Sequence, residues 1–150
     1  MSKKCITFAL KILKQYMNME KKDRELLVKD LSSRLSYNVI CSVSDGVVNR
    51  IYVLSSISKN GCGFDDNGAF YGFNSFVIKP YLRSMEDMTE EERGEYDNLL
   101  DVMYYNDFNN HIIQIDKYFD WLNAHHFDYH CLIEKGLAIR VTDDNNPYSI

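Results

Sequence analysis

The sequence predicts a single α+β domain, with a small antiparallel sheet of about three strands packed by four to five helices. Its 150 residues suit one domain, and 45% apolar with 26% charged residues is typical of a folded globular chain. Segments rich in β-branched residues occupy the middle of the chain. Apolar residues at helical spacing occupy both ends, which indicates helices around a central sheet.

The N-terminal part is predicted to be helical. Apolar residues recur at helical spacing over 4–17, and this wide apolar face suits a core helix or a contact between copies of the chain. Met19 is an alternative translation start, which would make 1–18 a helical extension. A second helix is predicted over 21–35, where leucines recur every four residues.

The sheet is predicted from residues 37–58 and 72–79. Two strands flank Asp45 and Gly46, a pair typical of a tight hairpin turn. The third strand is expected to end at Pro80, which has no amide N–H for a ladder. The glycine-rich segment between them, "GCGFDDNGAF", is expected to be a loop or a loosely paired hairpin.

Helices are predicted again toward the C-terminus. Thr89 and Glu92 form a capping box that opens one helix, and "DKYFDWLNAHH" follows as another. "CLIEKGLAI" is expected to add a short helical turn that stops at Gly136. The predicted domain therefore spans 19–142, with a flexible tail over 143–150.

Charge and composition limit the function. Residues 1–34 carry a net charge of +5 and the rest carries −10, so nucleic acid is a poor partner for the acidic body. No apolar run reaches the roughly 18 residues of a membrane span. The four cysteines are scattered without CxxC pairs, which is typical of free thiols in a reducing compartment. We expect a cytoplasmic protein without a cofactor.

The segment "HHFDYHC" holds the densest set of metal-ligand side chains. His126 and His130 are four residues apart, and Asp128 or Cys131 is a candidate third ligand. A metalloprotease helix needs Glu directly after the first histidine, where this chain has Phe127. We therefore expect no metal site and interpret the segment as a packing element, with these residues as weak candidates.

Two other regions are candidate binding sites. The glycine-rich segment lacks a phosphate-loop motif, but with neighbouring residues it predicts a small-molecule pocket. The acidic stretch that follows imitates a nucleic-acid backbone to a basic protein partner. The pocket residues are Tyr71, Phe73, Lys79 and Arg83, and the partner-binding residues are Glu86, Asp87, Glu90, Glu91 and Glu95.

Three blocks together resemble a family of short uncharacterised proteins from phages, prophages and mobile elements of Bacteroides-type bacteria. They are "LLVKDLSSRLSYNVICSV", "VIKPYLRSMEDMTEEERGEYDNL" and "FDWLNAHHFDYHCLIEKGLAI". Family members begin near "EKKDRELL", so the resemblance implies that 1–18 is an extension. The family ending is similar to "FDYRGLIEKGLA", with Arg and Gly where this chain has His130 and Cys131, which argues against a family-wide metal site. The resemblance implies no activity.

The sequence favours a non-enzymatic accessory protein that binds a macromolecular partner, which we expect to be another protein, for instance in counter-defence. The absence of a catalytic motif, the 13% aromatic residues and the segregated charge support this expectation. One alternative is a protein that binds or hydrolyses a nucleotide signal or other small molecule. A second alternative is metal binding through residues 125–131, and the helix over 4–17 also suits a homo-oligomer contact.

Overall fold

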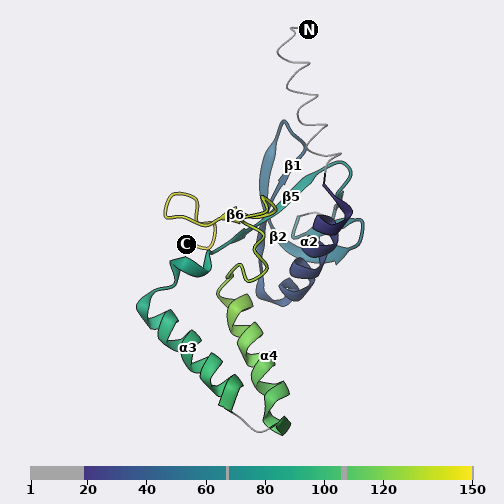
Figure 1. Ribbon diagram of the computed structural model, residues 1–150. Coiled ribbons are helices and arrows are strands. Elements are labelled where there is room, and N and C mark those ends of the chain that lie inside the picture. The colour runs from purple at the N-terminus through teal and green to yellow at the C-terminus, as the bar shows by residue number, and fades with distance from the viewer. Residues whose placement is uncertain (1–18, 67, 106–107, 150) are drawn as a thin grey trace, which may run out of the picture.

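The computed structural model describes residues 19–66, 68–105 and 108–149. These residues form one six-stranded sheet in the order β4-β3-β2-β1-β5-β6, with three α-helices (Figure 1). All strand pairs are antiparallel except β5 with β6, which is parallel. The strands are β1 Ile40–Ser44, β2 Asn49–Ser58, β3 Gly61–Phe64, β4 Phe70–Gly72, β5 Val77–Leu82 and β6 Ile139–Arg140, and the α-helices are α2 Lys21–Ser33, α3 Glu90–Tyr105 and α4 Phe108–Ala124.

The predicted sheet of about three antiparallel strands under four to five helices is wrong, although the combination of a sheet with helices is right. The described residues hold six strands, one pair of them parallel, and three α-helices. The helix predicted over 4–17 lies outside the described residues. The segment "CLIEKGLAI" is not part of a regular helix, but it contains one turn, in which the Lys135 amide donates to the Cys131 carbonyl at 3.3 Å, and this turn ends at Gly136 (φ +71°) as predicted, before β6.

The glycine-rich segment forms β3 and β4, an antiparallel pair, which is the hairpin alternative of the two that the sequence predicted. A Cβ atom at Gly61 would lie 2.2 Å from the carbonyl oxygen of Tyr71, and one at Gly63 would lie 2.3 Å from Oγ of Ser56. Glycine is therefore required at Gly61, where the obstructing atom belongs to the backbone of the neighbouring strand, whereas at Gly63 the Ser56 side chain would have to move. Glycine also removes the alternation of side chains by which strands are recognised, which explains why these two strands were not counted in the predicted sheet.

The predicted hairpin between β1 and β2 is confirmed. The Asp45 carboxylate accepts hydrogen bonds from the amides of Val47 and Val48, both at 2.8 Å, and Gly46 adopts φ +92°. The third predicted strand does not end at Pro80, because β5 continues to Leu82. Its partner β6 pairs only beyond the proline, so the missing N–H costs no hydrogen bond there.

The main core lies between α2 and one face of the sheet (Figure 1). Leu27 and Leu31, four residues apart on α2, are fully buried. They belong to one cluster with side chains of β1, β2, β3 and β5 and of the segment after α4. The other buried apolar members are Val39, Cys41, Val43, Leu54, Cys62, Phe64, Phe73, Ile78, Leu82, Leu132, Leu137 and Ala138.

Helices α3 and α4 form a hairpin that extends away from the sheet (Figure 1). The capping box at its start is confirmed: the Thr89 amide donates to Glu92, and the Glu92 amide donates to the Thr89 hydroxyl at 3.1 Å. Aromatic rings join the helices, with Tyr96 5.7 Å from Tyr118 and 6.1 Å from Trp121 between centroids. The two helices therefore pack mainly on each other.

Candidate functional site

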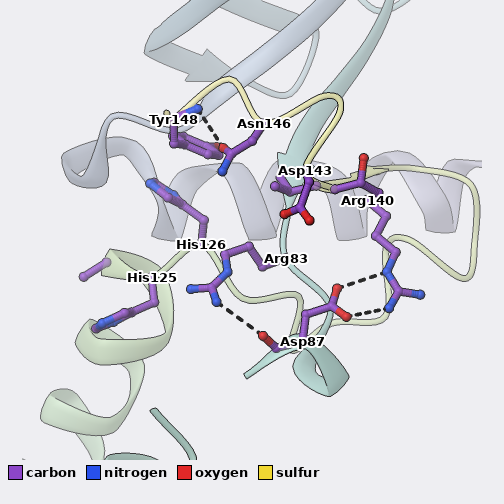
Figure 2. Close-up of a pocket in the computed structure, with 11 residues that line it drawn as sticks. Arg83, Asp87, His125, His126, Arg140, Asp143, Asn146 and Tyr148 are labelled. Atoms are coloured by element: carbon purple, nitrogen blue, oxygen red, sulfur yellow. Dashed lines mark hydrogen bonds and ion pairs between the residues drawn. The ribbon is translucent and has the colours of Figure 1, made fainter. Parts of the chain in front are cut away.

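A groove of about 940 Å³ lies where the helical hairpin meets the sheet (Figure 2). Its walls are formed by the end of α4, the end of β6, the short helix η2 (Met85–Asp87) and the C-terminal segment. Its volume is in the range of small-molecule and side-chain binding sites. Its lining residues are Arg83, Asp87, Ala124, His125, His126, Arg140, Val141, Thr142, Asp143, Asn146 and Tyr148.

Two arginines of the groove are neutralised by carboxylates. Arg140 donates two hydrogen bonds to Asp87, from Nη2 to Oδ1 at 2.7 Å and from Nε to Oδ2 at 3.1 Å. Arg83 donates two to Glu92, at 2.7 and 2.8 Å. The hydrogen bonds from Arg83 lower the pKa of Glu92 to about 2, and those from Arg140 lower the pKa of Asp87. Both carboxylates are therefore ionised near neutral pH.

Arg83 also joins the hairpin to the sheet. Its guanidinium carbon lies 4.4 Å from the ring centre of Phe127, which is fully buried. Its amide donates to the carbonyl of His126 at 2.8 Å, and its carbonyl accepts from the amide of Asp128 at 2.8 Å. Because Glu92 belongs to α3, the Arg83 side chain connects the end of β5 both to α3 and to the segment that follows α4.

Asp143 is the carboxylate of the groove that has no ion-pair partner among the described residues. Figure 2 shows it between the Arg83 and Arg140 side chains, pointing into the groove. The ion pairs of the described chain join other residues, and Asp143 is exposed. The groove therefore presents one carboxylate that is open to a ligand.

The two histidines of the groove form stacked pairs with aromatic rings. The His125 ring lies 4.3 Å from Trp121, whose carbonyl its Nδ1 contacts at 2.8 Å. His126 adopts φ +59° and stacks on Tyr148, with centroids 3.9 Å apart and planes at 11°. Burial, helped by the charge of Arg34, lowers the pKa of His126 to about 4, so it is neutral at pH 7.

No family model, curated protein or solved structure matches this chain. Its function must therefore be argued from the groove and the surfaces around it. Within 19–66, 68–105 and 108–149, no helix is long and apolar enough to cross a membrane.

The C-terminal segment, expected as a tail, contributes Tyr148 to the groove. The Tyr148 hydroxyl donates to the carbonyl of Tyr81 at 2.8 Å and accepts from the amide of Ile40 at 3.1 Å. The segment is thereby attached to both β5 and β1 behind the groove. Within the polar run "DDNNPYS", only Pro147 and Tyr148 have a rigid or aromatic side chain. These two residues were the available sequence signal that the segment is attached to the domain.

A buried ionic network lies behind His126. Arg34 and Asp30 are both fully buried and form two hydrogen bonds, at 2.7 and 2.9 Å. Arg34 also donates to the carbonyl of Phe127 at 2.8 Å, and His130 Nδ1 lies 2.9 Å from Asp30. Burial raises the pKa of Asp30, but hydrogen bonds from His130 and Arg34 outweigh it and leave the pKa below its ordinary value.

The three weak metal candidates point to different partners. His126 stacks on Tyr148, His130 contacts Asp30, and the Asp128 carboxylate accepts the amides of Leu132 and Ile133. Across the described ranges, no group of three or more His, Cys, Asp or Glu side chains is arranged to hold a metal ion.

The four predicted pocket residues are not brought together. Phe73 is buried in the main core, and Tyr71 packs in a cluster with other rings. Lys79 pairs across the sheet with Ser42. Arg83 lines the groove at the base of the hairpin, a site built from segments that the sequence did not connect.

The five predicted partner-binding carboxylates are all exposed and lie at the start of the hairpin. Two of them have partners: Asp87 pairs with Arg140, and Glu95 accepts a hydrogen bond from Trp121 at 2.8 Å. We define the acidic face by the remaining three, which are Glu86, Glu90 and Glu91.

Proposed function

We propose that the protein acts without catalysis, by binding a basic protein partner through the acidic face of its helical hairpin. The observation that carries this proposal is the separation of the hairpin from the sheet together with its charge. Nine Asp and Glu residues occur in the hairpin sequence 90–124, against Arg93 and Lys117. The resemblance to mobile-element proteins supports an accessory role in a bacterial host cell, such as counter-defence.

Helix capping accounts for only part of the hairpin's acidity. Glu92 completes the capping box and also pairs with Arg83, so a single carboxylate both caps α3 and neutralises the arginine. Glu90 and Glu91 precede it on the same helical turn and are exposed to solvent. Glu92 is neutralised by Arg83, but Glu90 and Glu91 add two further negative charges, which a basic partner compensates on binding.

The charge selects the class of partner. The field of this face repels nucleic acid and attracts lysine- and arginine-rich protein surfaces. Electrostatic association of this kind weakens with salt, because the Debye length falls to about 3 Å at 1 M ionic strength.

Affinity capture from host lysate tests the proposal when it is combined with charge-neutral variants. The triple variant Glu86→Gln, Glu90→Gln, Glu91→Gln should lose a basic partner that the unmodified protein retains at low salt. The matched control Glu25→Gln, Asp65→Asn, Glu134→Gln removes three exposed carboxylates elsewhere and should retain it. Equal capture by both variants, or no specific partner at low salt, contradicts the proposal.

A further inference from the structure

We infer that the groove at the base of the hairpin receives an arginine or lysine side chain of the bound protein, with Asp143 as its counter-ion. This inference rests on the proposed function, because the groove adjoins the acidic face: Asp87 lines the groove, and Glu86 precedes it on η2. It adds a specific anchor to an otherwise diffuse electrostatic contact.

The charge balance of the groove favours a cation. Arg83 and Arg140 are each held in a two-point ion pair, with Glu92 and Asp87 respectively. These pairs cancel, which leaves Asp143 as the uncompensated charge. Glu86 also acts on Arg140 through its charge. An anionic ligand would have to compete with two ionised carboxylates for the arginines.

The walls suit a side chain with an apolar stem and a charged end. The His125 ring packs against Trp121 and the His126 ring stacks on Tyr148, so both rings are held in place. His126 is neutral at pH 7 and does not repel a cation. Planar guanidinium groups stack on such rings, and lysine stems pack against them.

The size of the groove suits a segment of a protein. Its volume of about 940 Å³ exceeds the needs of a single side chain. A basic side chain at Asp143 therefore leaves room for its own main chain and a neighbour. From there the partner continues past Asp87 to Glu86, the first residue of the acidic face.

Titration of the full-length protein with small cations tests the groove separately from the acidic face. We would add acetyl-arginine amide or acetyl-lysine amide, with acetyl-glutamine amide as the neutral control. Trp121 is the only tryptophan of the chain and lies against His125 of the groove, so its fluorescence reports occupancy. We expect a saturable change with one or both cationic amides and none with the neutral amide.

Substitution of Asp143 decides whether it is the counter-ion. Asp143→Asn should weaken binding of the cationic amide at least tenfold, while Asp144→Asn on the next residue should leave it within twofold. Asp143 is exposed and forms no ion pair with the residues that the structure describes, so urea unfolding of Asp143→Asn should match that of the unmodified protein. Equal binding by Asp143→Asn and unmodified protein, or no fluorescence response to either cation, overturns the inference.

Two further binding measurements distinguish a failure of this inference from a failure of the proposed function. The triple variant of the acidic face should still bind the cationic amide, because Glu86, Glu90 and Glu91 do not line the groove. If the triple variant binds the cationic amide and also captures the partner as well as the unmodified protein does, the proposed function is contradicted while the inference about the groove is supported. Adenosine monophosphate supplies the opposite charge, and tighter binding of this nucleotide than of either cationic amide would overturn the inference in favour of an anion site.

Discussion

The sheet with α2 and the α3–α4 hairpin use charged residues in opposite ways. In the sheet region, Asp30 and Arg34 are fully buried and form two hydrogen bonds with each other. In the hairpin, Glu90 and Glu91 are exposed, whereas Glu92 pairs with Arg83 at the start of α3 and Asp120 near the end of α4 accepts a hydrogen bond from Tyr37. Charges that are buried and paired hold the fold, whereas exposed carboxylates in excess of structural need are available to a partner. The groove lies where the two regions meet.

The largest expected effect is in the sheet region. Arg34→Met leaves the Asp30 carboxylate buried with only His130 beside it, and we expect the free energy of unfolding to fall by about 3–5 kcal/mol. Urea unfolding measures this loss. The double variant Asp30→Leu, Arg34→Met should recover most of it, because both charges are then absent. A loss below about 1 kcal/mol for Arg34→Met would show that the pair is not buried in solution.

The next largest expected effect is a pH dependence of the folding stability, caused by His126 where the hairpin meets the sheet. The pKa of His126 is lowered from 6.5 to about 4, so the unfolded chain binds a proton in this window that the folded chain excludes. Stability should therefore fall as the pH drops from 6.5 to 4. Asp30, whose folded pKa is also lowered, contributes only as the pH falls below its ordinary value of 3.8.

His126→Asn provides the control for that pH dependence. Asn tolerates the left-handed conformation of this position and does not titrate. Its urea midpoint should vary less between pH 6.5 and 4 than that of the unmodified protein. The charges of Arg34, His125 and Arg83 face His126 in both proteins, so an unchanged slope would assign the effect to another group.

A smaller effect should be confined to the hairpin. Thr89→Ala removes the hydroxyl that caps α3, at a cost of about 1 kcal/mol. Hydrogen exchange should become faster for amides of α3, with the strands unaffected, because the two helices pack mainly on each other. Thr89→Ser keeps the cap and should keep the protection. Faster exchange throughout the sheet would show that the two regions unfold as one unit.

The smallest expected effect is an increase in folding stability. Cys131 is exposed and adopts φ +59°, a conformation that costs side-chain-bearing residues about 1–2 kcal/mol. Cys131→Gly should raise the stability by up to about 1 kcal/mol, since glycine's greater entropy in the unfolded chain offsets part of the relief. The melting temperatures of Cys131→Gly and of Cys131→Ala, which keeps the strained conformation, are compared with that of the unmodified protein. A lower melting temperature for the glycine variant would contradict this explanation.

Local motifs were predicted well from the sequence. The turn at Asp45 and Gly46 and the capping box of Thr89 and Glu92 are formed by residues within a few positions of each other. Their hydrogen bonds require no knowledge of the rest of the chain. The same reasoning explains why α2 was placed within a few residues of its observed bounds.

The remaining strands and the groove depend on contacts between distant segments. β6 is only two residues long and exists because it lies beside β5, about sixty positions earlier in the sequence. Asp30 and Arg34 have the spacing of an ordinary surface pair, and nothing local shows that the segment after α4 covers them.

The histidine segment has features that depend on neighbouring residues and features that depend on the tertiary fold. Its sequence already argued against a metalloprotease helix, because Phe127 stands where a glutamate is needed. The separate directions of His125, His126 and His130 follow from the end of α4 and from the left-handed conformation at His126. The sequence thus determined the local turns, the helix cap and the excess of acid in the hairpin, because these depend on neighbouring residues. The fold alone placed Arg34 in the core and Asp143 in a groove, because burial and pairing depend on residues that are far apart in the chain.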